Sequence, residues 1–188
     1  LVDPVALERF RMMHMSQGYV SAHSGELMSS LAYVSFQELA TRVSHRNTGK
    51  FTQDPMCENL LTRVAADDNL HMIFYRNLLG AALKISPDQA MVAILEVVKN
   101  FQMPGANLPG FQRKAVEMAI EGIYDLRQHK DEVVAPVLRF WKVFELEGLS
   151  AEGEAARTEL AEFMDALEKQ ALRFEEKREM LKSRMAPR

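Results

Sequence analysis

The stretch "VAADDNLHMIFYRN" at positions 64–77 places three ionisable side chains in a segment that is otherwise rich in apolar residues. Asp67, Asp68 and His71 fall within five positions of one another. A carboxylate or imidazole that is buried without a partner carries a large desolvation cost. Either this face of the segment is solvated, or a charged partner lies against it.

A second segment carries an acid in a comparable position. Positions 27, 31, 34, 38, 41 and 45 follow alternating steps of four and three, so their side chains line one face of a helix. Glu38 lies in the middle of this seam, where a carboxylate is out of place. Asp68 and His71 are three positions apart and project side by side from one face of another helix. Two helices therefore each bring an acid to a face that should be buried.

A metal ion is the economical explanation for these positions. A bound cation keeps buried carboxylates ionised and imidazole neutral, so residues that are costly alone become ligands. Di-iron carboxylate bundles use a lone Glu from each of two helices and an acid-x-x-His pair from each of two others. Glu38 is one lone acid, and Asp68 with His71 is one such pair. The spacing predicts half of a two-iron site.

The same residues also have ordinary interpretations. Glu38 can turn towards solvent, and His71 can be a hydrogen-bonded core histidine. Asp67 lies four positions before His71, so periodicity alone does not choose between Asp67 and Asp68 as the inward-facing acid.

Helical periodicity, punctuated by Pro and Gly, predicts an all-α fold with no period-2 strand pattern. The segments 18–25 and 102–110 are expected to be irregular. The segment 151–188 is expected to form a long amphipathic C-terminal helix that packs an apolar stripe on the bundle or on a second subunit: Leu160, Phe163, Leu167, Ala171 and Phe174. The expected helices span about 4–17, 26–46, 55–84, 87–101, 110–128, 130–146 and 151–183.

The composition limits the classes of protein to which this chain can belong. The 188 residues are enough for one helical domain spanning 1–188, and a net charge of −3 without a basic cluster argues against a nucleic-acid partner. No apolar run approaches the ~20 residues needed to cross a bilayer. Cys57 is the single cysteine, which fits a reducing cytoplasm. Surface or capping positions are expected for the isolated histidines His14, His23 and His129.

Several segments resemble the soluble acyl-acyl carrier protein (acyl-ACP) desaturases, most of all the mycobacterial type. The resemblance covers about residues 1–157 in consistent order. Its most specific parts are the S-F-Q-E-x-A-T and A-D-x-x-x-H blocks. The segments that carry it are "YVSFQELATRVSHRNTGK" (33–50), "VAADDNLHMIFYRNLLG" (64–80), "FQMPG" (101–105) and "WKVFELEGLSAEGEAAR" (141–157).

The resemblance implies a ferritin-like helical bundle of the di-iron carboxylate type, a homodimer with two iron ions. It implies that Glu38, Asp68 and His71 are iron ligands, with Asp68 standing where the family normally has glutamate. Asp67 matches an aspartate that orients a ligand, and Thr41 matches a threonine beside the oxygen-binding face. The other ligand set, a lone Glu and an E-E-x-R-H block, is expected on helices upstream of Leu1, which are missing from this sequence.

The leading hypothesis is therefore an oxidoreductase of fatty acid biosynthesis. It would introduce a cis double bond into a fatty acyl chain on acyl carrier protein, with O2 and electrons from a reduced ferredoxin. With half of the ligand set, the 188-residue chain alone is expected to be inactive. The alternative is a catalytically inactive desaturase-like helical module for binding or dimerisation.

Overall fold

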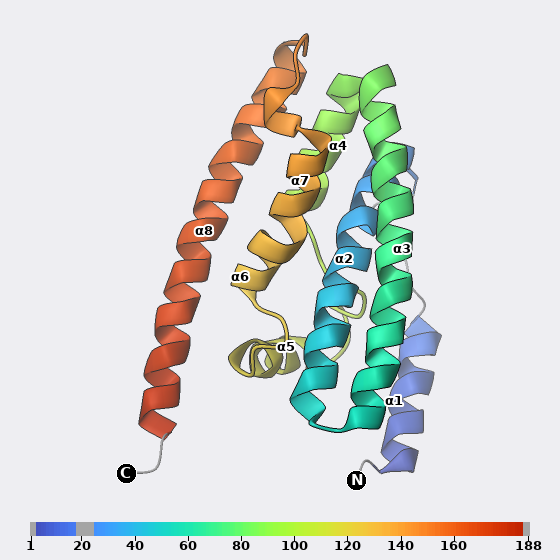
Figure 1. The fold of residues 1–188 in the computed structure, drawn as a ribbon, viewed down its shortest axis with the longest axis vertical. Coiled ribbons are helices and arrows are strands. Elements are labelled where there is room, and N and C mark those ends of the chain that lie inside the picture. The colour runs from blue at the N-terminus through green and yellow to red at the C-terminus, as the bar shows by residue number, and fades with distance from the viewer. Residues whose placement is uncertain (1–2, 18–24, 186–188) are drawn as a thin grey trace.

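The computed structural model describes residues 3–17 and 25–185, and all the regular elements in these ranges are helices (Figure 1). The all-α prediction is confirmed. The elements are α1 (Pro4–Gln17), α2 (Leu27–Thr52), α3 (Pro55–Ile85), α4 (Pro87–Lys99), α5 (Phe111–Ile120), α6 (Leu126–Gln128), the π-helix η1 (His129–Val134), α7 (Ala135–Trp141), the 3-10 helix η2 (Val143–Glu145) and α8 (Ala151–Met185).

Helices α2 and α3 form an antiparallel hairpin that runs along one side of the molecule (Figure 1). Gln53 ends α2 in the left-handed conformation, with φ of 54°. Asp54 then begins α3, because its carboxylate accepts hydrogen bonds from the backbone N–H groups of Met56 at 2.8 Å and Cys57 at 3.3 Å. The connection between the two helices is therefore a two-residue turn.

The expected end of this helix near residue 46 is wrong, because α2 continues to Thr52. The polar segment 46–52 has partners that support a helix. The Asn47 side-chain amide donates to the carbonyl of Ile123 at 3.0 Å. Gly49 is buried against α3, and a Cβ there would lie 3.1 Å from the Cα of Glu58. The glycine thus permits close approach of the two helices instead of ending one of them.

The core lies on the inner side of the hairpin. Side chains from α2, α3, α4, η1, α7 and α8 meet there in one hydrophobic cluster. Burial of these apolar surfaces is the main stabilising contribution to the fold. The largest of the fully buried side chains include Phe36, Leu79, Met91, Ile94, Leu138 and Leu160.

The expected helix boundary near residue 129 is also wrong. Helix α5 ends at Ile120, and a continuous helical run then extends from Leu126 through η1 to Trp141. Asp125 begins this run with a capping box, in which its side chain and that of Gln128 bond each other's backbone N–H. Pro136 lacks an N–H and crowds the carbonyl four residues earlier, and the wider π-helical turns precede it at η1.

The C-terminal helix α8 packs along the bundle with the stripe that its sequence predicts. Leu160, Leu167 and Ala171 are buried, and Phe163 and Phe174 are half-buried. The segment 102–110 is irregular, as expected.

Arg127 of α6 anchors α8 to the rest of the bundle. Its guanidinium bonds Glu168 at 2.7 Å and Glu175 at 3.0 and 3.1 Å. These partners raise the pKa of Arg127, and the bonds from Arg127 and Lys130 lower the pKa of Glu168 to about 2. All these groups are charged at neutral pH, so the contact is an ion-pair network.

Helix α1 is exposed along almost its whole length, including the apolar side chains of Val5, Leu7 and Phe10. Most of the expected irregular segment 18–25, with His23, lies outside the described residues. No helix in the described ranges combines the length and the apolar character needed to cross a membrane.

The expectation of a surface position for His129 is wrong, because its ring is largely enclosed. It stacks on Phe101 with ring centroids 4.9 Å apart, and the Tyr124 hydroxyl lies 2.8 Å from its Nδ1. Burial lowers the pKa of His129 to about 4. A neutral Nδ1 accepts the tyrosine O–H, so this environment favours the uncharged ring.

The burial of His129 predicts that the fold loses stability as the pH falls. Between about pH 6.5 and 4 the unfolded chain binds a proton at His129 that the folded chain does not, so stability falls as the pH falls through this window. The contribution lost is up to about 3 kcal/mol. Urea unfolding of His129→Phe across this window is expected to show a smaller decline than the unsubstituted protein. His14→Ala, at an exposed histidine, is the control, and identical pH profiles for all three proteins would contradict the assignment.

Candidate metal centre

The α2–α3 hairpin brings the three predicted ligands together. Glu38 projects from α2, and Asp68 and His71 project from α3. One ligand atom from each of the three lies within 4.8 Å of the other two. These are the residues that the seam spacing singled out.

Glu38 is the residue of this cluster that α2 contributes. Its Oε2 lies 3.4 Å from Nδ1 of His71, and its side chain is largely buried. Burial raises the pKa of the Glu38 carboxyl above its ordinary value, an effect that the hydrogen bond with His71 partly opposes. A nearby cation would lower this pKa again, because it stabilises the ionised carboxylate.

Asp68 has a partner that the sequence analysis did not assign. Its Oδ2 lies 2.8 Å from Nδ1 of His45, and Asp68 itself is buried. A carboxylate that binds a metal is normally oriented by such a hydrogen bond. His45 lies on the same α2 seam as Glu38, seven positions further along, but the seam alone does not tell which residue of α3 it faces.

The other residues of the prediction occupy different environments. Thr41 is half-buried one turn after Glu38, and its hydroxyl donates to the Glu38 main-chain carbonyl at 3.0 Å. Asp67 lies on the exposed side of α3. The side chain of His71 is 59% exposed, so the face that carries it is open.

These donors fit a transition-metal centre. Nitrogen and oxygen ligands lie about 2.0–2.2 Å from such an ion, so donors that share one ion are at most about 4.4 Å apart. Two ions about 3.5–4 Å apart spread their donors more widely. A spread of up to 4.8 Å suits either arrangement after small side-chain rotations. One lone carboxylate with one acid-x-x-His pair is also the half-set that di-iron carboxylate bundles use.

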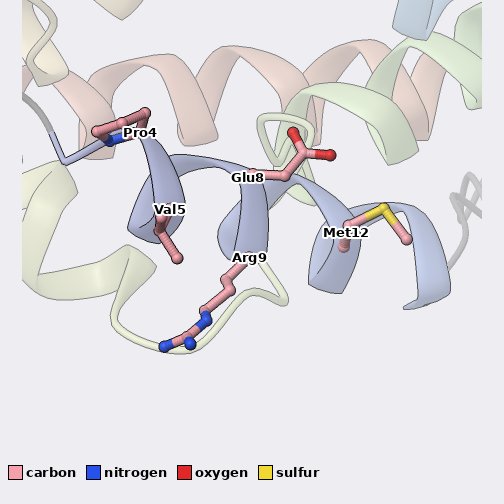
Figure 2. Close-up of a pocket in the computed structure, with 5 residues that line it drawn as sticks. All are labelled: Pro4, Val5, Glu8, Arg9 and Met12. Carbon is pink, nitrogen blue, oxygen red and sulfur yellow. The ribbon is translucent and has the colours of Figure 1, made fainter.

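A shallow hollow lies elsewhere on the surface, along α1 (Figure 2). All of its lining residues come from this one exposed helix, and none belongs to the α2–α3 hairpin. It therefore has no part in the metal centre. The lining residues are Pro4, Val5, Glu8, Arg9 and Met12.

Comparisons with known proteins all find similarity to fatty acid desaturases. The profile of the family described as fatty acid desaturase matches residues 1–187. DesA1 of Mycobacterium tuberculosis, provisionally named an acyl-ACP desaturase, is 48% identical over 181 residues, which cover 93% of this chain and 54% of DesA1. The chloroplastic stearoyl-ACP 9-desaturase 1 of Oryza sativa subsp. japonica is 33% identical over 158 residues, 78% of this chain and 40% of the rice protein.

A solved structure supports the fold. The X-ray structure of the mycobacterial protein DesA2, from the strain H37Rv, superposes with a TM-score of 0.62 at 26% identity and covers 75% of this chain and 53% of that one. The helical architecture of this chain therefore matches the ferritin-like fold of the desaturases. The chain spans about half the length of the first relatives it matches. With a family profile that matches nearly all of its residues, the chain belongs to the fatty acid desaturase family.

Proposed function

We propose that the chain is part of a di-iron acyl-ACP desaturase that introduces a cis double bond into a fatty acyl chain. The observation that carries this proposal is the cluster of Glu38, Asp68 and His71 in a member of the desaturase family. A helical protein without a redox centre could not remove hydrogen from an unactivated methylene, and this cluster is a donor set able to hold one.

Each residue has a defined part in this proposal. Glu38, Asp68 and His71 hold the iron, and His45 fixes the orientation of Asp68. When bound, iron supplies the oxygen activation that the reaction needs. Thr41 stands beside the centre on α2, where a hydroxyl can hold or pass a proton. Asp67 is proposed to orient a ligand in the complete centre.

The complete centre needs a second ligand set. Bundles of this type hold their two metals between four helices, and α2 and α3 are two of them. We propose that the other lone Glu and the other acid-x-x-His pair lie on two further helices of the complete protein, N-terminal to Leu1. We propose O2 as the oxidant, a ferredoxin-type protein as electron donor, acyl-ACP as substrate, a homodimeric assembly and a cytoplasmic location.

The experiment measures bound iron and product together. The 188-residue chain and a chain extended N-terminally through the second ligand set are loaded with Fe2+ without oxygen. They are then assayed with saturated acyl-ACPs, reduced ferredoxin and O2. The short chain is expected to bind iron weakly and to form no product, because it holds half of the ligands. The extended chain should bind about two irons per subunit and form unsaturated product. An extended chain without iron, or with iron and no product, would instead support the inactive binding module.

A further inference from the structure

Tyr124 and His129 form a hydrogen-bonded pair that the proposed metal centre does not use. The Tyr124 hydroxyl lies 2.8 Å from Nδ1 of His129, and the two ring centroids are 6.1 Å apart. Tyr124 lies between α5 and α6, and His129 is the first residue of η1. The capping box of Asp125 and Gln128 fixes the short turn that connects them, so this turn holds the hydroxyl against the imidazole.

The surroundings of the pair keep both groups uncharged at neutral pH. Burial, and then the carboxylates of Glu132 and Asp125, raise the pKa of Tyr124 above its ordinary value. Burial lowers the pKa of His129 to about 4, so the ring is neutral and its Nδ1 accepts the phenolic hydrogen. The phenol therefore does not ionise on its own, but its hydrogen points at an unprotonated base.

We propose that Tyr124 is a redox-active residue and that His129 takes up its proton when the phenol is oxidised. One electron leaves the phenol for an oxidant, the phenolic O–H bond breaks, and the proton forms an N–H bond at Nδ1 of His129. The products are a neutral tyrosyl radical and an imidazolium ion. Reduction by one electron returns the proton to the phenolic oxygen and restores the pair.

The local charges favour this coupled step over loss of the electron alone. An oxidised phenol is a far stronger acid than an imidazolium ion, so the proton moves to Nδ1 although burial disfavours a charged ring. Glu132 and Asp125 oppose a phenolate, and their negative charge stabilises a positive imidazolium. Glu132 has the larger effect of the two, and Asp125 is also paired with Arg178. Without a proton acceptor, the oxidised phenol would be an unpaired buried charge.

The oxidant is the oxygen-activated metal centre, and this part of the inference rests on the proposed function. Aromatic contacts connect the pair to the helix that carries Glu38. The ring of His129 stacks on Phe101 with centroids 4.9 Å apart, and Phe101 packs on Tyr33 of α2 at 5.8 Å. Tyr33 precedes Glu38 by five positions, about 7.5 Å along the helix axis. An electron from Tyr124 would thereby reduce an oxidised centre that has no substrate to react with.

The first test generates an oxidant with light and needs no metal in the protein. A flash oxidises a ruthenium polypyridyl complex to Ru(III) beside the 188-residue chain, and electron paramagnetic resonance detects the trapped tyrosyl radical. Tyr124→Phe is expected to remove most of this signal. Tyr33→Phe should keep it, because the Tyr33 hydroxyl donates to the main-chain carbonyl of Gln102, which cannot hold a proton. An unchanged signal in Tyr124→Phe would overturn the inference.

The rate of oxidation tests the part of His129. His129→Gln keeps a hydrogen-bond acceptor but removes the base, so Tyr124 is expected to be oxidised at least about 100-fold more slowly. His14→Gln, at an exposed histidine of α1, should leave the rate unchanged. Circular dichroism verifies that both variants remain helical. The rate in the unsubstituted chain should also fall in D2O, which needs no variant. Equal rates in the two variants, or no solvent isotope effect, would overturn the role of His129.

A second arm separates this inference from the proposed function. The N-terminally extended chain, loaded with Fe2+ and exposed to O2 without acyl-ACP, is expected to give the same Tyr124 radical. If light produces this radical and iron with O2 does not, the metal centre is not the oxidant, and that part of the inference is overturned. If the extended chain binds no iron, the proposed function fails, and the light-driven oxidation still decides whether the pair is redox-active.

Discussion

Replacing His71 with alanine is expected to lower the affinity of the chain for Co2+ or Fe2+ by at least about 100-fold. Loss of a group that only orients a ligand costs about 10–100-fold in affinity, and His71 is itself a proposed ligand. Its side chain is largely exposed and lies outside the core, so the free energy of unfolding should change by less than about 0.5 kcal/mol. Calorimetric titration and urea unfolding measure the two quantities. Where the unsubstituted protein desaturates, the substitution should abolish product formation.

Substitutions of two other histidines provide comparisons for this result. His45→Ala removes the partner of Asp68 and keeps all three proposed ligands, so a loss of about tenfold in affinity is expected. His14→Ala changes an exposed histidine on α1 and should leave the affinity unchanged. If His71→Ala binds metal as tightly as His14→Ala does, the ligand assignment is wrong.

The largest expected loss of stability follows from Trp141→Ala. The indole is buried and meets the ring of Phe36 edge to face, with centroids 5.5 Å apart. Its Nε1–H donates to the main-chain carbonyl of Arg76 at 2.8 Å, which ties α7 to α3. The substitution leaves a cavity and removes the hydrogen bond from the indole N–H, at a cost of about 3–5 kcal/mol. That is a large share of the stability of a typical domain.

The neighbouring Phe140 is the matched control, because its ring is 48% exposed and lies over the guanidinium of Arg76. Phe140→Ala should lower the free energy of unfolding by about 1 kcal/mol at most. Urea unfolding of the two variants at neutral pH makes the comparison. Similar small losses for both variants would show that the Trp141 contacts do not hold α7 on the hairpin.

Sequence reasoning predicted that Glu38, Asp68 and His71 converge, because their spacing is a property of single helices. Steps of three and four put Glu38 on one seam and Asp68 with His71 on another, and the hairpin then brings these seams together. The choice between Asp67 and Asp68 needed more than periodicity. In the structure Asp68 is buried and Asp67 is exposed, a difference that depends on how α3 is rotated against α2.

The errors in the sequence reasoning come from tertiary contacts. The segment 46–52 is polar and contains Gly49, so it resembled a loop, but close packing on α3 keeps it helical. The pairing of His45 with Asp68 depends on which residues face each other across the hairpin, and no single-helix pattern contains that information. The helix that begins at Asp125 could have been found, because Asp125 and Gln128 have the spacing of a capping box.

The two-residue turn at Gln53 and Asp54 bears on the entropy of assembling the centre. Glu38 and His71 lie only 33 positions apart along the chain, and most of the intervening residues are already ordered within the two helices. The entropy lost on closing a loop grows with its flexible length, which here is a single tight turn. Contacts within the hairpin join residues that are close in sequence, so they keep the contact order of the fold low. The conformational entropy lost in bringing these donors together is thus already lost when the hairpin forms, and metal binding adds little to that loss.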